Sequence, residues 1–444
     1  MNRSAFKPSA FLPSFLLNSA IATLATASML APGITPAVEA ALEDSPKVVI
    51  DEVWQIVNDE FVGTDFDMNA WQATRQELLG RQYLSQTDAY TAIRDALKLL
   101  NDPYTRFLDP SEYSDLTNQT SGELSGIGVQ LTVDEQTSSL KVIQPLEDSP
   151  AAAAGIEAGD RILRIDNRPT ALMTVEEASE ILRGEEGSTV RLQLVRPQKG
   201  LFEVTIQRAQ IEVPVLHYSL QQEGNLSIGY LRLDEFSSHA AEQMGKAITA
   251  LEAQNAQGFV LDLRGNPGGL LFASVDIARM WMETGMIVRT VDRQGGDRQY
   301  SANRTSLTEL PLVVLVDHYS ASASEILAAA LKDNGRAILV GSRTYGKGTV
   351  QSVHQLSDES GLAVTISRYY PPSGITINKH GVTPNIEVDL SRDQQRLLRA
   401  NPSIQGTQRD PQYQRAIAAL QETFFGMTVP ALPTPITLNG QQPR

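Results

Sequence analysis

The hydrophobic pattern of the chain changes character twice, and its first part is helical. From Pro46 to about Leu116, apolar residues recur every three or four positions, as expected of amphipathic helices. A turn-rich run from Asn101 to Pro110 marks the end of these helices. We therefore predict a helical N-terminal domain over residues 46–118.

Residues 119–209 have the pattern of a small β-rich domain. Helical patterns occur within it at 151–154 and 175–182. Short apolar runs between turn residues predict strands at 127–133, 140–143, 161–165, 190–195 and 202–206. This mixture indicates an α+β domain.

From residue 210 to 400, strand and helix patterns alternate. Strands are predicted at 226–233, 258–263, 312–316 and 337–340, and helices at 239–254, 270–282 and 322–334. The alternation predicts an α/β core, in which ligands bind beyond the carboxyl ends of the strands. Residues 401–444 form a tail rich in Pro and Gln, and we expect its end to be loosely held.

The first 40 residues differ from the rest in composition. No charged side chain occurs between Pro8 and Val38, and small residues at positions 38 and 40 would suit cleavage after Ala40. We predict a signal peptide over residues 1–40 and export of the protein. An uncleaved membrane anchor is the alternative, and Pro13, Asn18 and Pro32 within the run argue against it.

Overall composition excludes several classes of protein. The 444 residues are 41% hydrophobic and 20% charged, which is typical of globular chains. The net charge of −15 leaves no basic stripe for a phosphate backbone, so nucleic acid is not expected as a partner. The chain has no cysteine, which excludes disulfides, Cys-ligated metal and a thiol nucleophile. No metal or cofactor is implied.

Candidate chemistry begins at Ser322, which follows an apolar strand and opens a predicted helix. Its spacing from Glu325 fits a capping box, so on this segment alone the hydroxyl would serve as a helix cap. Lys347 lies 25 residues later between two glycines, and it could serve as a base for Ser322. The pair would need no histidine.

Lys347 can act as a base only if its amine is neutral. This requires a pKa about three units below 10.4, or about 4 kcal/mol of desolvation, and hence a dry pocket without charge. If residues 349–353 form a strand, Gln351 shares a face with Lys347, and its amide can steady the amine.

Two other readings of these residues remain. Residues 341–347 match most of a phosphate-binding loop, but Gly348 stands where that motif needs Ser or Thr, and a β-type run follows. A serine protease triad is the second option. No GxSxG elbow or HExxH motif occurs, and His354 is the best candidate among the histidines, which are His217, His239, His318, His354 and His380.

A glycine-rich turn at Asp262–Gly269 supplies the third element. Alone it would be a tight turn. Beside Ser322, its backbone N–H groups could bind the oxygen of a tetrahedral intermediate, a role worth about 3 to 4 kcal/mol per donor.

Two motifs in the β-rich domain resemble those of PDZ domains. Residues 154–165 resemble the PDZ signature, and Ser125–Val129 resembles the carboxylate-binding loop. The resemblance implies that Gly126, Ile127, Gly128 and Val129 bind the C-terminus of a protein.

Four further motifs extend the resemblance over nearly the whole chain. They are Asp102–Phe107, Arg264–Gly269, Ser320–Ile326 and Thr344–Gln351. Together with the PDZ motifs they resemble the carboxyl-terminal processing peptidases, or tail-specific proteases, of the S41 type.

That resemblance implies roles for particular residues and a core of the crotonase/ClpP-like type. Ser322 would be the nucleophile, Lys347 the base and Gln351 its partner. Gly268 and Ala323 would donate backbone N–H groups to the oxyanion. Asp333 would match an aspartate sometimes counted as a third catalytic member.

Residues 102–124 resemble most closely the photosynthetic members that trim the photosystem II D1 precursor. This implies a protein substrate held by its C-terminus and a location in the thylakoid lumen or periplasm. The sequence leaves open peripheral membrane association and the oligomeric state. The rival functions are a non-catalytic ligand-binding protein on the same core and a PDZ-bearing protease that uses His354.

Overall fold

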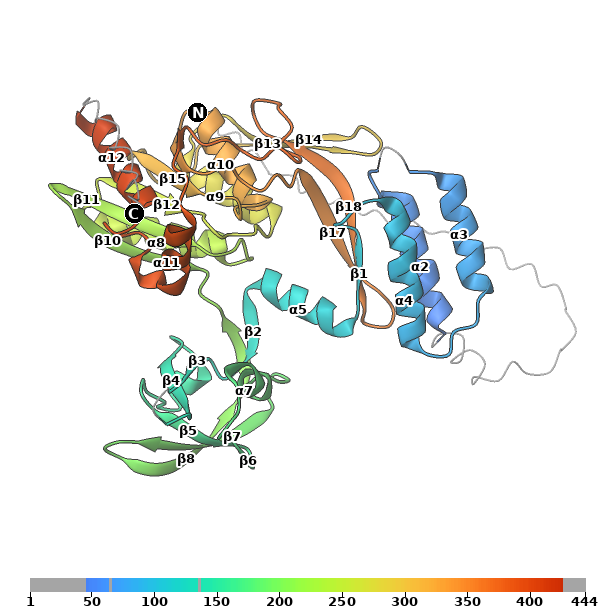
Figure 1. The fold of residues 1–444 in the computed structure, drawn as a ribbon, viewed down its shortest axis with the longest axis horizontal. Helices are drawn as coiled ribbons and strands as arrows, with labels where there is room; N and C mark the ends of the chain where they lie inside the picture. The colour runs from blue at the N-terminus through green and yellow to red at the C-terminus, as the bar shows by residue number, and fades with distance from the viewer. Residues whose placement is uncertain (1–44, 64–65, 135–136, 426–444) are drawn as a thin grey trace, which may run out of the picture. The chain divides into compact units, whose positions relative to one another are not determined.

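The computed structural model describes residues 45–63, 66–134 and 137–425 (Figure 1). The predicted signal peptide and the end of the predicted tail lie outside these ranges. Over the described ranges, no helix combines the length and apolarity needed to cross a bilayer. The elements confirm a mixed architecture with a helical N-terminal region, a small β domain and an α/β core.

Three helices open the described chain: α2 (Pro46–Glu60), α3 (Met68–Gly80) and α4 (Gln86–Leu97). The side chains of Asp67 and Ser85 cap α3 and α4 by accepting backbone N–H groups. The apolar faces of these helices meet around Val57, Trp71 and Ile93, all buried. A short 3-10 turn (Lys98–Leu100) and β1 (Arg106–Leu108) lead away from them.

Residues 123–212 form the small β domain. Its sheet has the order β3 (Val129–Val133), β4 (Leu140–Pro145), β5 (Arg161–Ile165), β7 (Thr189–Arg196) and β8 (Gly200–Gln207), with β6 (Arg168–Pro169) beside β5 and the helices α6 (Pro150–Ala153) and α7 (Val175–Leu182). After α5 (Pro110–Ser121), the chain enters through β2 (Glu123–Gly126) and leaves through β9 (Ala209–Glu212). These two strands pair antiparallel, so the entering and leaving segments are hydrogen-bonded to each other.

The α/β core is built on a six-stranded sheet. Its order is β10 (Leu216–Glu223), β11 (Leu226–Leu233), β12 (Gly258–Asp262), β15 (Leu312–Val316), β16 (Ile338–Gly341) and β19 (Ile386–Glu387), parallel from β11 onward. On one face pack α8 (Ala240–Ala253), α9 (Leu271–Trp281) and α10 (Ala323–Asp333). Because β12 and β15 are buried on both faces, their sequences are apolar except for Asp262 at the end of β12.

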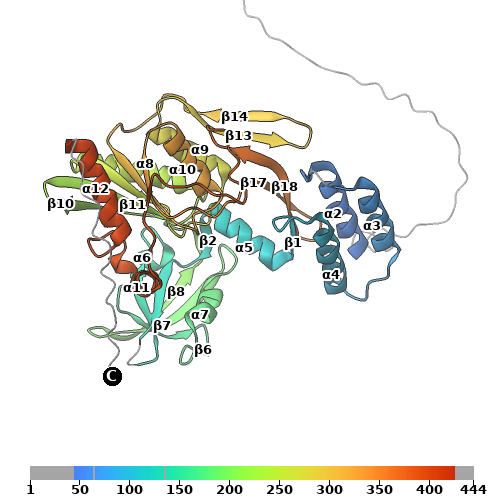
Figure 2. The ribbon, with the colours of Figure 1, turned by 45° about the horizontal axis from the view of Figure 1, so that its top comes forward.

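A second sheet extends from the core to the N-terminal helices (Figures 1 and 2). It contains β1, β13 (Met286–Asp292), β14 (Asp297–Ser301), β17 (Thr349–Gln355) and β18 (Gly361–Tyr370). Leu362 and Val364 of β18 pack into the hydrophobic cluster of α2 and α4. Strand β17 pairs only with β18 among the described strands, so its other edge is open.

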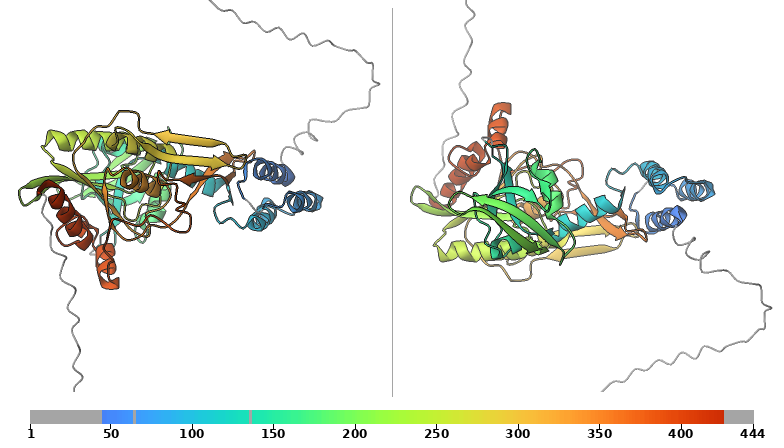
Figure 3. Two further views of the ribbon diagram at one scale, coloured as in Figure 1. Left: turned by 90° about the horizontal axis from the view of Figure 1, so that it is seen from above. Right: turned by 90° about the horizontal axis from the view of Figure 1, so that it is seen from below.

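The predicted tail contains a helix that was not predicted. After α11 (Arg392–Ala400) and a 3-10 turn (Pro402–Ile404), α12 (Pro411–Phe425) covers the face of the core sheet opposite α8 (Figure 3). Tyr413, Ala416 and Leu420 are buried there at helical spacing. This part of residues 401–444 is therefore firmly packed, and the surrounding Pro and Gln residues concealed the pattern.

A buried ionic cluster joins α12 to the glycine-rich turn after β12. Arg264 lies 2.5 Å from the Asp262 carboxylate and 2.7 Å from that of Asp410, and all three side chains are buried. Burial alone would raise the pKa of Asp262, but the charge and hydrogen bonds of Arg264 hold it below its ordinary value. The Arg264 guanidinium therefore forms ion pairs with two carboxylates.

We predict that Arg264→Met destabilises the protein by about 3 to 5 kcal/mol, because two buried carboxylates lose their cation. Asp410→Asn should cost less, because Arg264 keeps Asp262. Urea denaturation would measure both. Arg396→Met, which breaks the exposed pair with Asp393, is the matched control and should cause no measurable loss. Equal stabilities for Arg264→Met and Arg396→Met would contradict the cluster's role.

Candidate active site

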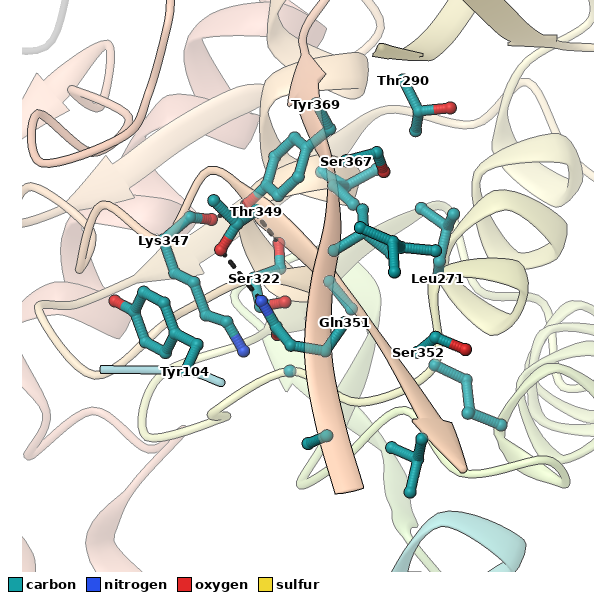
Figure 4. Close-up of a pocket in the computed structure, with 18 of the residues that line it drawn as sticks. Tyr104, Leu271, Thr290, Ser322, Lys347, Thr349, Gln351, Ser352, Ser367 and Tyr369 are labelled. Atoms are coloured by element: carbon teal, nitrogen blue, oxygen red, sulfur yellow. Dashed lines mark hydrogen bonds between the residues drawn. The ribbon is translucent and has the colours of Figure 1, made fainter. Parts of the chain in front are cut away.

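A cleft of about 1190 Å³ collects most of the predicted catalytic residues (Figure 4). It is lined by residues of α9, α10, β13, β17 and β18 and by the loops that precede them. Among the lining residues are Gly268, Ser322, Ala323, Lys347 and Gln351. Segments distant in the chain therefore meet in one cleft.

Ser322 stands at the start of α10 in a strained conformation. Its φ of 53° and ψ of −111° are unusual for a residue with a side chain and cost roughly 1 to 3 kcal/mol. The Glu325 half of the predicted capping box is a 2.9 Å hydrogen bond from the Ser322 N–H. The Ser322 side chain forms no cap hydrogen bond, so its hydroxyl remains available in the cleft.

The neighbouring serines have structural partners instead. Ser320 Oγ donates to the Leu263 carbonyl at 2.8 Å, and Ser324 Oγ donates to the Asn266 carbonyl at 3.0 Å. Both are buried outside the cleft. Ser322 is therefore the candidate nucleophile of the run.

The Lys347 side chain is half-buried beside Tyr104. Its Nζ lies 4.8 Å from the centre of the Tyr104 ring, and it donates no hydrogen bond to any residue that the structure describes. Burial lowers the pKa of the Lys347 amine, and the charge of Arg106 lowers it further, while Asp102 and Glu325 act in the opposite direction. The net direction is the one that a general base requires.

The amide nitrogen of Gln351 donates hydrogen bonds to two threonine hydroxyl groups. Gln351 Nε2 donates to Thr349 Oγ1 at 3.0 Å (Figure 4). The same nitrogen donates to Thr365 Oγ1 at 3.2 Å. Thr365 Oγ1 in turn donates to Asp102 at 2.5 Å. This arrangement leaves the Gln351 carbonyl oxygen as the group that could accept from Lys347. Asp102 was missed as a site residue, although it opens one of the motifs noted above.

The glycine-rich turn packs directly on the candidate nucleophile. Gly268 has a φ of 109°, and a Cβ on it would lie 2.9 Å from Ser322 Cβ. Its N–H donates to Asn266 Oδ1 at 2.8 Å, so this predicted oxyanion donor is engaged. The Ala323 N–H has no acceptor among the described residues and lies at the positive end of α10.

Asp333 is not brought to the cleft. It ends α10, about 15 Å along the helix from Ala323. Its carboxylate accepts the Ser373 N–H at 3.0 Å, which ties down a loop at the far end of the helix. The contact indicates a structural role.

The histidines are engaged elsewhere. His354 Nε2 lies 2.9 Å from a Glu60 carboxylate oxygen, and His239 and His217 pair with Glu123 and Asp234. All five histidines belong to the described ranges, and none of them lines the cleft. The geometry does not support a Ser/His arrangement.

The β domain presents an open edge beside its glycine loop. Strand β3 is the last strand of its sheet, and α7 packs against it. Ile127 is buried and Gly128 has a φ of 76°. The N–H groups of both residues lack acceptors among the described residues, as expected of a loop that binds a carboxylate.

Comparisons with known proteins identify the family of this chain. The model of peptidase family S41 matches residues 227–388, and a PDZ-domain model matches residues 141–196. A carboxyl-terminal-processing protease of Picosynechococcus sp. is 43% identical over 372 residues, covering 84% of this chain and 88% of that protein. A chloroplastic C-terminal processing peptidase of Tetradesmus obliquus is 36% identical over 360 residues, with 78% of each chain covered.

The fold of this chain is also similar to that of a solved structure. The chain resembles a photosystem II D1 C-terminal processing protease with a TM-score of 0.51 and 35% identity. The match covers 83% of this chain and 99% of that one.

We predict that Gly268→Ala slows the reaction of Ser322 with a fluorophosphonate about 100-fold. The new Cβ would meet the Ala321 carbonyl at 2.8 Å and displace the backbone that presents Ser322. Labelling followed by mass spectrometry measures the rate. Gly265→Ala is the matched control, since Gly265 also has a positive φ but has open space at its Cβ position. Equal rates in the two variants would contradict the packing argument.

Proposed function

The chain belongs to peptidase family S41, and on this premise we propose that it is a carboxyl-terminal-processing serine endopeptidase with a Ser322/Lys347 dyad. The main observation in support of the dyad is that both residues line one cleft. A strained Ser322 without a hydrogen bond to its hydroxyl and a half-buried Lys347 line the same cleft, together with Ala323, whose N–H has no acceptor among the described residues.

In the proposed mechanism, neutral Lys347 takes the proton of Ser322 as Oγ attacks the scissile carbonyl. The resulting oxyanion accepts the Ala323 N–H at the start of α10. Gly268 becomes a second donor once its N–H turns from Asn266. Lys347 then protonates the leaving amine, and an acyl-enzyme remains. Lys347 then takes a proton from water, and the resulting hydroxide attacks the acyl carbonyl. The bond from the carbonyl carbon to Ser322 Oγ breaks, and Lys347 returns the proton to Oγ.

Two open strand edges support a polypeptide substrate. The β17 edge runs along the cleft from Thr349 to Val353, where an extended chain could add main-chain hydrogen bonds. The loop at Ile127 and Gly128 could hold the substrate's C-terminal carboxylate, beside the β3 edge. The β domain would then capture the tail and the cleft would cut it.

The proposed physiological substrate is the precursor of the photosystem II D1 protein. The cyanobacterial and chloroplastic relatives and the D1-processing structural match support this choice. It implies a location in the thylakoid lumen or periplasm, in line with the predicted signal peptide. A non-catalytic binding protein would have no need of a strained serine beside a buried amine.

We predict that the purified protein removes a C-terminal extension from D1 precursor, as read by mass spectrometry of the product's C-terminus. Ser322→Ala should stay folded, should still bind a peptide with a free carboxylate, and should lose at least 1000-fold in turnover. Amidating the substrate's C-terminus should raise KM, because the β domain then loses the carboxylate.

Turnover by Ser322→Ala within tenfold of wild type would rule out Ser322 as the nucleophile. Trimming of other lumenal precursors without cleavage of D1 precursor would refute only the choice of substrate.

A further inference from the structure

One carboxylate binds the backbones of both dyad residues. Glu325 Oε2 accepts the Ser322 N–H and the Lys347 N–H, each at 2.9 Å. Its Oε1 accepts the Gly346 N–H at 2.7 Å and the Thr344 hydroxyl at 2.5 Å. A capping box would account only for the Ser322 contact. The other three donors belong to the loop that carries Lys347.

One phenol contacts the carbonyl groups of the same two residues. The Tyr369 hydroxyl lies 3.2 Å from the Ser322 carbonyl oxygen and forms a short contact with that of Lys347 (Figure 4). Tyr369 comes from β18, so a third segment of the chain takes part. Ser322 and Lys347 are thereby joined twice, by their N–H groups and by their carbonyl groups.

Both side chains are buried, so these contacts are not screened by water. Glu325 is 0% exposed and Tyr369 is 2% exposed. Burial raises the pKa of the Glu325 carboxyl, while hydrogen bonds from Thr344, Lys347, Gly346 and Ser322 oppose the rise. A buried charge is retained only where donors compensate it, and four donors with a helix N-terminus do so here.

The contacts of Glu325 and Tyr369 hold Ser322 in its strained backbone conformation. A residue keeps an unfavourable φ only when its surroundings over-determine it. Glu325 holds the N–H of Ser322 and Tyr369 contacts its carbonyl, so both of its neighbouring peptide groups are held. The same two side chains hold Lys347.

We propose that Glu325 and Tyr369 are positioning residues that set the distance and orientation between Ser322 and Lys347. The proposal rests on the dyad function above. Neither residue takes a proton in the reaction; each acts through the backbone of the reacting pair.

Labelling with a fluorophosphonate tests the proposal without a known substrate. Ser322 Oγ displaces fluoride from phosphorus while its proton passes to Lys347, so the rate depends on the geometry of the pair. Tyr369→Phe removes one oxygen atom. We expect its maximal labelling rate to fall between about 10-fold and 100-fold, with the reagent's binding constant unchanged within about twofold.

Glu325→Gln keeps the shape of the side chain but replaces one acceptor oxygen by a donor. We expect a larger fall than in Tyr369→Phe, and the double variant should be little worse than Glu325→Gln alone, because both residues hold the same pair.

Tyr413→Phe is the matched control. Tyr413 is equally buried, and its hydroxyl bonds to Gln221 and Glu223 on the opposite face of the core sheet. A merely structural role predicts similar losses of thermal stability in both tyrosine variants and unchanged labelling of the folded protein. A maximal rate for Tyr369→Phe within twofold of that for Tyr413→Phe would overturn the proposal. If Glu325→Gln does not fold, the comparison of Tyr369→Phe with Tyr413→Phe still tests the proposal.

The outcome separates the two proposals. Absence of labelling at Ser322 in the wild type would refute the dyad itself. Normal labelling in the wild type and in Tyr369→Phe would refute only the positioning roles.

Discussion

A lysine can act as a base only where water is kept from its amine, and this constraint organises the site. Burial is the largest influence that lowers the pKa of Lys347, and the nearby Arg106 adds to it. The carboxylates of Glu325 and Asp102 oppose this effect, yet both accept hydrogen bonds from backbone or hydroxyl donors. These carboxylates thus bind donors other than the Lys347 amine, while the neutral amide of Gln351 lines the same cleft as Lys347.

The geometry of the cleft depends on elements far from it. Arg264 fixes the glycine-rich turn to α12 through Asp410, and the turn in turn packs on Ser322. Tyr104 comes from the loop after the N-terminal helices, and those helices pack on β18, which carries Tyr369. The surroundings of Ser322 are therefore built by contacts from the helical region, both sheets of the core and the C-terminal helix.

The elements predicted from the sequence were those whose hydrophobic pattern is local. Strands β12 and β15 are mostly apolar runs, and α8 and α10 have clear helical spacing. Strands β13, β14 and β18 were not predicted. Strand β14 is polar and largely exposed, so it carries no apolar pattern although it forms a local hairpin with β13, whereas β13 and β18 pair with each other across a long stretch of chain. Ser322, Lys347 and Gln351 were predicted through motif and chemistry, and the structure places all three in one cleft. Asp102 and Asn266 lie within recognised motifs, but the motifs alone do not indicate what these side chains bind. The contacts of Asp102 with Thr365 and of Tyr369 with Ser322 and Lys347 cross the fold, and the local sequence carries no signal for them.

The central claim is that the Lys347 amine is neutral when the enzyme works, and an NMR titration tests it directly. Lysine labelled with ¹³C at Cε, with Lys347→Arg to assign the resonance, reports the protonation of this one amine. Because the folded pKa is lowered, the amine should lose its proton below the ordinary value of about 10.4, and activity should rise with pH through that midpoint. A midpoint at or above the ordinary value would contradict the account.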